Sequence, residues 1–285
     1  MLYAILGLGA LGFVFGVSLS LASKKFFVKL DPREEAVINV LPGTNCGACG
    51  FPGCAGLARA IVKGGAPANA CTSGGADVIK NVSHIMGVEA VVKEKEVAVI
   101  MCKGGKNEAR EKFRYIGVND CKAATLIAGG NKSCTYACLG LGTCERFCPY
   151  GAIRMDDNHL PVVDEEKCTG CTLCAVNCPK FVIKMIPVSN KIHIRCNSLD
   201  KGAVTRKNCS VGCIVCKKCE KVCPLGAITI VNNLAVIDPI KCDNCRKCVP
   251  ECPTDTIENY YASEPKYASL MEKILEESKL KSAVG

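Results

Sequence analysis

The fold is decided by the stretch Lys-Cys-Thr-Gly-Cys-Thr-Leu-Cys-Ala-Val-Asn-Cys-Pro, which runs from Lys167 to Pro179. Its four cysteines are separated by two, two and three residues, and a proline follows the last one. Three thiolates at the shorter spacing wrap one cubane [4Fe–4S] cluster, whereas the fourth thiolate, ahead of the proline, reaches a second cluster. A zinc ribbon uses pairs of cysteines and has no need for a third cysteine at the same short spacing. The stretch therefore predicts ligands for two iron–sulfur clusters.

The end of this stretch recurs along the chain as a Cys-Pro step with an isoleucine five residues after the cysteine. The steps begin at Cys148, Cys178, Cys223 and Cys252. They are 30 and 29 residues apart within the two pairs, and 75 and 74 residues apart between the pairs. A fixed period indicates duplicated structural units. The sequence therefore predicts two tandem modules of the bacterial ferredoxin type, each with two clusters.

Paired clusters exchange their fourth ligand, and this exchange assigns the cysteines of each module. In the first module, one predicted set is Cys148, Cys168, Cys171 and Cys174, and the other is Cys134, Cys138, Cys144 and Cys178. In the second module, one set is Cys213, Cys216, Cys219 and Cys252, and the other is Cys223, Cys242, Cys245 and Cys248. The set that begins at Cys134 is irregular, because its spacing loosens to three, five and three residues.

A separate cysteine group lies nearer the N-terminus, in Asn45-Cys-Gly-Ala-Cys-Gly-Phe-Pro-Gly-Cys54, and Cys71 follows it. Its glycines allow sharp turns that point backbone N–H groups at sulfur, as a cluster site requires. We predict that Cys46, Cys49, Cys54 and Cys71 hold one more [4Fe–4S] cluster, with a zinc knuckle as the alternative. Five [4Fe–4S] clusters are thus expected, with iron bound through these cysteines, and no catalytic residue is predicted.

Four cysteines remain outside these sets, at Cys102, Cys121, Cys196 and Cys209. Free cysteine commonly packs as a small buried hydrophobe, and we expect that role for them. An alternative for Cys209 is competition for the cluster of Cys213. A sixth cluster shared by the four is not supported by their spacing.

The N-terminal residues Leu2 to Ala22 carry no charge and no proline, and they are numerous enough to cross a bilayer as a helix. Lys24, Lys25 and Lys29 follow at once, so the positive-inside rule places the rest of the chain in the cytoplasm. A cleaved signal peptide is the alternative, but it would lack a basic first region. We expect a single anchor in the cell membrane with the cluster domains on the cytoplasmic side.

The formal charge of +9 counts the 24 cysteines as neutral. Each oxidised cluster with four thiolates carries −2, so five clusters bring the net charge to about −1. We therefore expect the basic residues to neutralise clusters, and no nucleic-acid partner. A Gly-x-Gly-x-x-Gly run at residues 7–12 lacks the preceding strand and the later acidic residue of a dinucleotide site, so no NAD or flavin site is expected.

Basic residues lie among or beside the cysteines of the second module, at Lys217, Lys218, Lys221, Arg246 and Lys247. The equivalent positions of the first module are largely neutral. Positive charge there favours an acidic carrier, so we predict that reduced ferredoxin docks at this end. Simple neutralisation of the clusters is the alternative.

The apolar N-terminus, the Cys46 group and the doubled ferredoxin repeat together resemble the B subunit of the Rnf complex, the membrane-bound ion-translocating ferredoxin:NAD+ oxidoreductase. The resemblance covers essentially the whole chain, in the longer version of the family. It implies electron transfer from reduced ferredoxin toward membrane subunits, coupling to Na+ or H+ movement, and the A, C, D, E and G subunits as partners, with NAD reduced on another subunit. The alternative is a polyferredoxin subunit of a hydrogenase or formate dehydrogenase complex, which would lack a true anchor.

The expected fold class is α+β, with an N-terminal transmembrane helix, a small 4Fe-4S domain and two tandem 2[4Fe-4S] ferredoxin-like modules. The predicted boundaries are 1–29 for the anchor, 30–90 for the single-cluster domain, 91–133 for a connecting segment without an assigned role, 134–195 and 196–262 for the two modules, and 263–285 for a charged tail. Helices are expected at residues 34–40, 57–63 and 77–86 of the single-cluster domain and at 264–281 of the tail. A strand is expected at residues 96–101.

Overall fold

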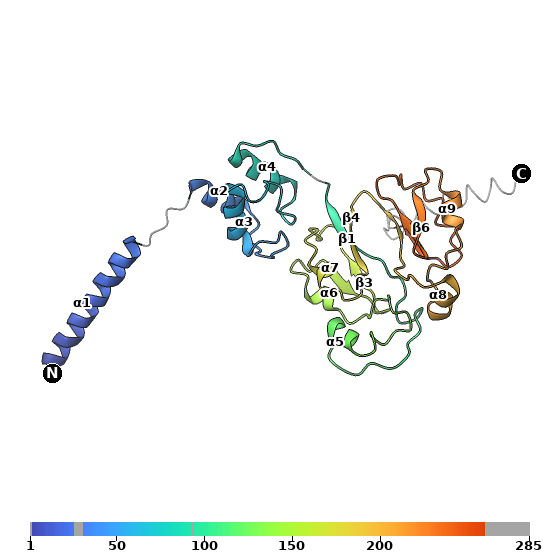
Figure 1. Ribbon diagram of the computed structural model, residues 1–285, viewed down its shortest axis with the longest axis horizontal. Helices are drawn as coiled ribbons and strands as arrows, with labels where there is room; N and C mark the ends of the chain where they lie inside the picture. Colours follow the sequence, from blue (N-terminus) through green and yellow to red (C-terminus); the bar gives the residue numbers. More distant parts are fainter. Residues whose placement is uncertain (1, 26–30, 93, 260–285) are drawn as a thin grey trace, which may run out of the picture.

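The computed structural model describes residues 2–25, 31–92 and 94–259 of the chain (Figure 1). Its helices are α1 (Leu2–Lys25), α2 (Pro32–Val40), α3 (Gly53–Val62), α4 (Gly75–Met86), α5 (Cys121–Leu126), α6 (Thr143–Arg146), α7 (Leu173–Val176), α8 (Gly202–Asn208) and α9 (Lys218–Val222). Its strands are β1 (Glu96–Ile100), β2 (Ile153–Met155), β3 (Pro161–Val163), β4 (Ile183–Pro187), β5 (Ile192–Ile194), β6 (Ile228–Val231), β7 (Leu234–Ile237) and β8 (Ile257–Asn259). The predicted tail helix lies outside the described residues.

The strands form four antiparallel pairs, two in each ferredoxin-like module. In the first module β1 pairs with β4 and joins the two ends of the module, while β2 and β3 form a hairpin between them. In the second module β5 pairs with β8 in the same way, around the hairpin of β6 and β7. The first module therefore begins at β1, inside the segment 91–133 for which the sequence predicts no role.

Strand β1 belongs to the first module because its side chains fill that module's core. Val97, Val99 and Ile100 are almost fully buried and cluster with Val182 and Ile183 around the cysteines of the module. Burial of such aliphatic side chains contributes roughly 1.5–3 kcal/mol each. The second module has a smaller core of the same kind, built from isoleucines of its four strands.

The N-terminal cysteine group lies in a small helical domain. Helices α2, α3 and α4 bury Val37, Leu57, Ile61 and Val82 against one another. The Asp31 carboxylate caps α2 by accepting a hydrogen bond from the N–H of Arg33, which satisfies a backbone donor at the helix start. The three predicted helices of this region are thus present, and they position the loop that carries Cys46 to Cys54.

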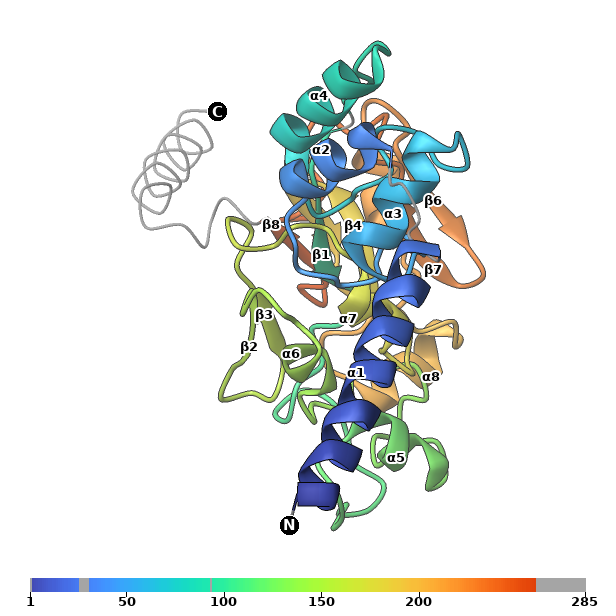
Figure 2. The ribbon, with the colours of Figure 1, turned by 90° about the vertical axis from the view of Figure 1, so that its left-hand side faces the viewer.

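Helix α1 stands at one end of the molecule, apart from the folded domains (Figure 1), and Figure 2, viewed from that end, shows α1 in front of them. Its described large apolar side chains are exposed, with Phe13 at 74% and Leu19 at 70% of full exposure. Among the residues whose side chains the structure describes, no helix combines the length and apolarity needed to cross a membrane. The predicted anchor is therefore not confirmed.

Candidate iron–sulfur centres

The three loops with two-residue cysteine spacing share one backbone path. The residues immediately before and after the middle cysteine adopt left-handed φ angles, as at Gly170 (+71°) and Thr172 (+66°). The same holds at Val215 (+59°) and Lys217 (+62°), and at Asn244 (+59°) and Arg246 (+64°). A residue with a Cβ pays about 1–2 kcal/mol for this conformation. Such strain persists only where the surroundings impose it, as at a binding loop.

Three predicted cysteine sets each surround a cavity in the structure. Cys148, Cys168, Cys171 and Cys174 line one in the first module. In the second module, Cys213, Cys216, Cys219 and Cys252 line one cavity, and Cys223, Cys242, Cys245 and Cys248 line another. Four thiolates around one enclosed space are the donor set of a [4Fe–4S] cluster. The structure therefore brings these three predicted sets together.

The fourth set differs from the prediction. Residues Gly140 (φ +73°) and Gly142 (φ +69°) repeat the left-handed pair, but Leu141 stands between them where the other loops have a cysteine. The cavity beside this loop is lined by Cys138, Cys144 and Cys178 together with Cys121, the first residue of α5. Cys134, a predicted member of this set, does not line it. Cys121 of α5 thus lines the same cavity as Cys138, Cys144 and Cys178.

The side chains around Cys144 support this grouping. Burial, together with the neighbouring thiolates of Cys121 and Cys178, raises the pKa of Cys144 to about 12. The N–H of Cys121 donates a 2.7 Å hydrogen bond to the hydroxyl of Thr143, next to Cys144. The sequence predicts only a packing role for Cys121. One signal in the sequence could have shown that this loop lacks a cysteine: Cys138, Leu141 and Cys144 keep the two-residue spacing of the other loops, with a leucine at the middle position.

Each Cys-Pro step also repeats one local geometry. The third residue after the cysteine has a left-handed φ at Gly151, Phe181, Gly226 and Asp255. The next N–H then donates to the cysteine sulfur, from Ala152 to Cys148, from Ala227 to Cys223 and from Thr256 to Cys252, at 3.3 Å each. Hydrogen bonds to sulfur favour the thiolate, the form that binds iron. At Cys252, burial opposes ionisation, but the N–H groups of Thr254 and Thr256 bring the pKa below its usual value.

At most of the other enclosed thiols, burial outweighs the hydrogen bonds to sulfur, so their pKa lies above its usual value. Burial raises the pKa of Cys174 and of Cys248 to about 12, and that of Cys219 to about 11. In each case nearby thiolates contribute to this rise, and for Cys248 the first of them is Cys219 of the neighbouring set. Buried thiols that repel one another when ionised become stable thiolates beside a bound cation, which deprotonates them. The donor sets therefore fit an iron–sulfur cluster.

The N-terminal set is held by the loop before α3 and by Cys71. The hydroxyl oxygen of Ser73 lies 3.6 Å from the sulfur of Cys46 and 3.9 Å from that of Cys71. The backbone of Gly53 has a φ of +79°, and a Cβ there would lie 2.7 Å from the side-chain oxygen of Asn45. That oxygen accepts a 2.8 Å hydrogen bond from the N–H of Cys54. A glycine at position 53 is therefore needed to close the loop.

Four cysteines outside these sets also surround a cavity. Cys102, Cys134, Cys196 and Cys209 line it, so Cys134 lies with three of the cysteines for which the sequence predicts separate packing. Among the described residues, no three His, Cys, Asp or Glu side chains converge closely enough to hold a single metal ion. A cubane cluster makes a different demand, because each cysteine binds a separate iron atom.

Family models match the chain in both cysteine-rich regions. The model described as "Putative Fe-S cluster" matches residues 41–73, and that of the 4Fe-4S dicluster domain matches residues 133–182 and 212–256. These regions contain the loops described above.

Three curated relatives are similar over most of the chain. The B subunit of the ion-translocating oxidoreductase complex of Methanosarcina acetivorans is 45% identical over 88% of this chain and 95% of its own length. The B subunit of the Na(+)-translocating ferredoxin:NAD(+) oxidoreductase complex of Acetobacterium woodii is 42% identical over 88% of this chain and 75% of its own. The proton-translocating counterpart from Clostridium ljungdahlii is 43% identical over 87% of this chain and 88% of its own.

Proposed function

Since the chain belongs to the family of B subunits of ion-translocating ferredoxin:NAD+ oxidoreductase (Rnf) complexes, we propose that it relays electrons from reduced ferredoxin through a row of [4Fe–4S] clusters toward membrane subunits. It is an iron–sulfur electron-transfer subunit of such an oxidoreductase. The observation that carries the proposal is the recurrence of four thiolates around one cavity in both modules. On the relatives' pattern, the transfer is coupled to Na+ or H+ movement. The hydrogenase or formate dehydrogenase alternative has no support from these relatives.

The proposed ligand sets are supported by the linings of four cavities and, in the N-terminal set, by the hydroxyl of Ser73 between Cys46 and Cys71. We assign one cluster each to Cys46, Cys49, Cys54 and Cys71; to Cys121, Cys138, Cys144 and Cys178; to Cys148, Cys168, Cys171 and Cys174; to Cys213, Cys216, Cys219 and Cys252; and to Cys223, Cys242, Cys245 and Cys248. The second of these sets takes Cys121 in place of the predicted Cys134. When bound, the clusters supply one-electron redox chemistry. The chain's own part is to hold the thiolates, to shield them and to donate N–H groups to sulfur.

Contacts between the sets indicate their order in the row. The hydroxyl of Thr44, near Cys46, lies 3.2 Å from that of Tyr150 in the first module. On that side burial raises the pKa of Cys171, and the Cys46 thiolate contributes to the rise. Cys144 likewise contributes to the raised pKa of Cys174, after burial and the thiolates of its own set. The N-terminal set therefore adjoins the Cys168 set, which adjoins the Cys144 set.

Reduced ferredoxin is proposed to dock at the second module. Cys216 and Cys245 are the two exposed cysteines among the 24 of the chain. Exposed Lys217 and Lys218 follow the first, and exposed Lys247 lies two residues after the second. An acidic carrier would be steered there by the positive charge and would meet sulfur at the surface.

Charge reversal tests this docking site. The double variant Lys217→Glu/Lys247→Glu should slow reduction of the chain by ferredoxin, most strongly at low ionic strength, because steering is screened by salt. The matched control is Lys63→Glu/Lys80→Glu, which reverses two exposed lysines of the N-terminal domain. Equal rates for both variants would exclude docking at the second module.

Helix α1 is proposed to anchor the chain in the cell membrane, with the cluster domains on the cytoplasmic side. Its described large apolar side chains are exposed, and Lys24 and Lys25 lie in its last turn, as the positive-inside rule requires at a cytoplasmic end. A chain produced in membranes should resist a high-salt and carbonate wash, whereas a chain that begins at residue 31 should be released. Release of the full chain would contradict the anchor.

The relay itself is tested by anaerobic reduction of the purified chain. Reduced ferredoxin should bleach its visible iron–sulfur absorbance, and iron and acid-labile sulfide should be present in equal amounts. A colourless chain that carries zinc would overturn the proposal. So would a coloured chain that ferredoxin cannot reduce.

A further inference from the structure

The cavity lined by Cys102, Cys134, Cys196 and Cys209 lies outside the five assigned sets. These cysteines are far apart in the sequence, yet their side chains surround one space. Three of them are at most 8% exposed. The question is whether they pack as hydrophobes or hold a ligand.

One segment of chain, residues 101–112, contributes Cys102, Gly104 and Ala109 to the lining of this cavity and joins its other walls. It carries Cys102, and Ala109 forms an antiparallel bridge with Cys209. Further backbone hydrogen bonds join it to neighbours of all three other cysteines: Lys103 N to Arg195 O (2.9 Å), Arg110 N to Asn208 O (2.9 Å) and Ser133 N to Arg110 O (2.7 Å). The four sulfurs are therefore held by a common backbone framework and do not meet by loose packing.

The sulfurs have the hydrogen-bond donors that the assigned ligands have. The N–H of the residue two positions on is directed at the sulfur of Cys134, Cys196 and Cys209, from Tyr136, Ser198 and Val211 respectively. The same offset occurs at Cys171 and Cys242 in the assigned sets. Cys102 accepts a 3.4 Å hydrogen bond from the N–H of Cys138. Donors of this kind stabilise thiolates rather than neutral thiols.

A buried lysine beside the cavity points to an anionic occupant. Lys132 is 3% exposed, and its ammonium group donates to the carbonyls of Gly104 (2.7 Å) and Gly105 (3.0 Å). Among the ion pairs of the described residues, none involves Lys132. A buried ammonium group needs a nearby negative charge, and Lys132 lies close enough to the sulfurs of Cys209, in this cavity, and of Cys138, in the neighbouring set, to favour their thiolate forms. Four thiolates around an oxidised cubane carry −2 and would supply that charge.

The backbone also leaves room for sulfur at this place. A Cβ on Gly104 would lie 2.8 Å from the sulfur of Cys209 and 4.0 Å from that of Cys102. Thiols that only pack together do not require a glycine this close to their sulfurs. A loop that holds a ligand does, because its backbone must approach the site closely.

We propose that Cys102, Cys134, Cys196 and Cys209 hold a sixth [4Fe–4S] cluster between the two ferredoxin-like modules. The inference rests on the proposed function, because it extends the same ligand chemistry to the remaining cysteines. All 24 cysteines of the chain then serve as ligands, in six sets of four.

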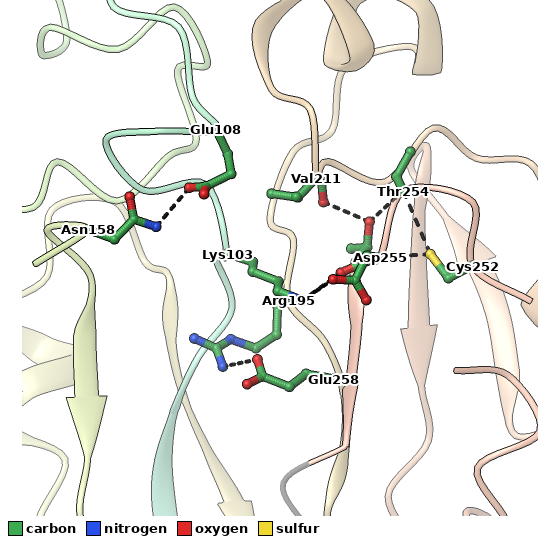
Figure 3. A network of polar contacts seen from close by, with 10 residues as sticks. Lys103, Glu108, Asn158, Arg195, Val211, Cys252, Thr254, Asp255 and Glu258 are labelled. Atoms are coloured by element: carbon green, nitrogen blue, oxygen red, sulfur yellow. Dashed lines mark hydrogen bonds and ion pairs between the residues drawn. The ribbon is translucent and has the colours of Figure 1, made fainter. Parts of the chain in front are cut away.

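The location gives this site its role. Its Cys102 neighbours Cys138 of the first module, and its Cys196 receives a hydrogen bond from the N–H of Cys213 in the second module. Figure 3 shows that the segment of residues 101–112 is bonded to both modules. Its Glu108 accepts a 2.8 Å hydrogen bond from Asn158 of the first module, and its Lys103 forms a 2.6 Å ion pair with Asp255 of the second. An electron that passes between the modules would cross at this point, oxidising one neighbour and reducing the next.

Metal analysis of the full chain, purified without oxygen, tests the sixth site. We expect about 24 iron atoms and as many sulfide ions per chain, against about 20 for five clusters. The variant Cys196→Ala/Cys209→Ala should lose about four irons. The control variant Cys216→Ala/Cys219→Ala, which removes an assigned cluster, should lose about four as well, and the quadruple variant about eight.

The outcomes separate this inference from the proposed function. A wild-type count of about 20 irons with a loss of four in the control overturns only the sixth cluster. A control that keeps its full iron content overturns the assigned sites. One zinc ion per chain that disappears with Cys196→Ala/Cys209→Ala would replace the cluster by a zinc site. If that variant does not fold, the wild-type count still decides.

Discussion

The role of Cys121 can be tested by moving its thiolate. In the loop from Cys138 to Cys144, Leu141 lies between two left-handed glycines at the position where the other three loops have their middle cysteine. Replacement of Cys121 by alanine should remove one ligand and with it one cluster. The double variant Cys121→Ala/Leu141→Cys should restore that cluster, because the backbone already presents position 141 as a ligand position.

The size of the effect follows from the ligand count. One set of four cysteines holds four irons, so Cys121→Ala should fall from about 24 to about 20 irons per chain, and the double variant should return to about 24. The matched control is Cys121→Ala/Leu139→Cys, which places the new thiol two residues earlier in the same loop. Iron and acid-labile sulfide are measured on anaerobically purified chains, with circular dichroism to compare folding.

Two results would refute this reasoning. If Cys121→Ala keeps all its iron, Cys121 is not a ligand and the packing role that the sequence predicts for it is right. If Leu139→Cys restores the cluster as well as Leu141→Cys, the register of the loop does not select the ligand. Combination with Cys134→Ala adds a check, because loss of Cys121 and Cys134 together should remove about eight irons from two different sites.

Three further perturbations follow from single contacts. Gly53→Ala should destabilise the N-terminal domain by about 1–2 kcal/mol and weaken the Cys46 site, because Gly53 has a left-handed φ and a Cβ there would clash with Asn45. Urea unfolding measures this loss, with Gly64→Ala as the control, since Gly64 is also left-handed but faces open space. Equal losses of stability in the two variants would count against the clash. Burial, together with the charges of Arg195 and Lys191, lowers the pKa of His193 to about 4. Below pH 6.5 the folded chain therefore binds fewer protons than the unfolded chain, and it should lose about 2 kcal/mol of stability by pH 5. The variant His193→Gln should reduce this loss, and a pH profile of stability that the substitution leaves unchanged would contradict the lowered pKa. Because burial raises the pKa of Cys174 and Cys248 to about 12, uptake of iron by the apoprotein should release protons and become more favourable as pH rises. Reconstitution in weak buffer would record the release of protons. Uptake that does not depend on pH would contradict the raised pKa of these thiols.

The parts of the fold that the sequence predicts well are those in which the chain repeats itself. The Cys-Pro steps and the loops with two-residue spacing recur, so the two modules and three of the ligand sets can be inferred from the intervals alone. The helices around Val37, Leu57 and Val82 can likewise be predicted, because apolar spacing and the Asp31 cap are local signals.

The parts that the sequence conceals depend on contacts between distant segments. Strand β1 pairs with β4 over a separation of 83 to 91 residues, from Ile100 with Ile183 to Glu96 with Pro187, and no local pattern identifies such a partner. Nearness in sequence groups Cys134 with Cys138, although its side chain lines a cavity with Cys102 and Cys209. Cys102, Cys196 and Cys209 have no common spacing, since the backbone framework of residues 101–112 brings them together only after folding.

The positions at which iron is bound along this chain test the assignment of its cysteines most directly. An anomalous difference map at the iron absorption edge, from crystals of the full chain grown without oxygen, locates the clusters directly. We predict six centres, one of them enclosed by Cys102, Cys134, Cys196 and Cys209 and another by Cys121, Cys138, Cys144 and Cys178. A map with no iron between the two modules, or with Cys134 bound to the same centre as Cys144, would contradict this prediction.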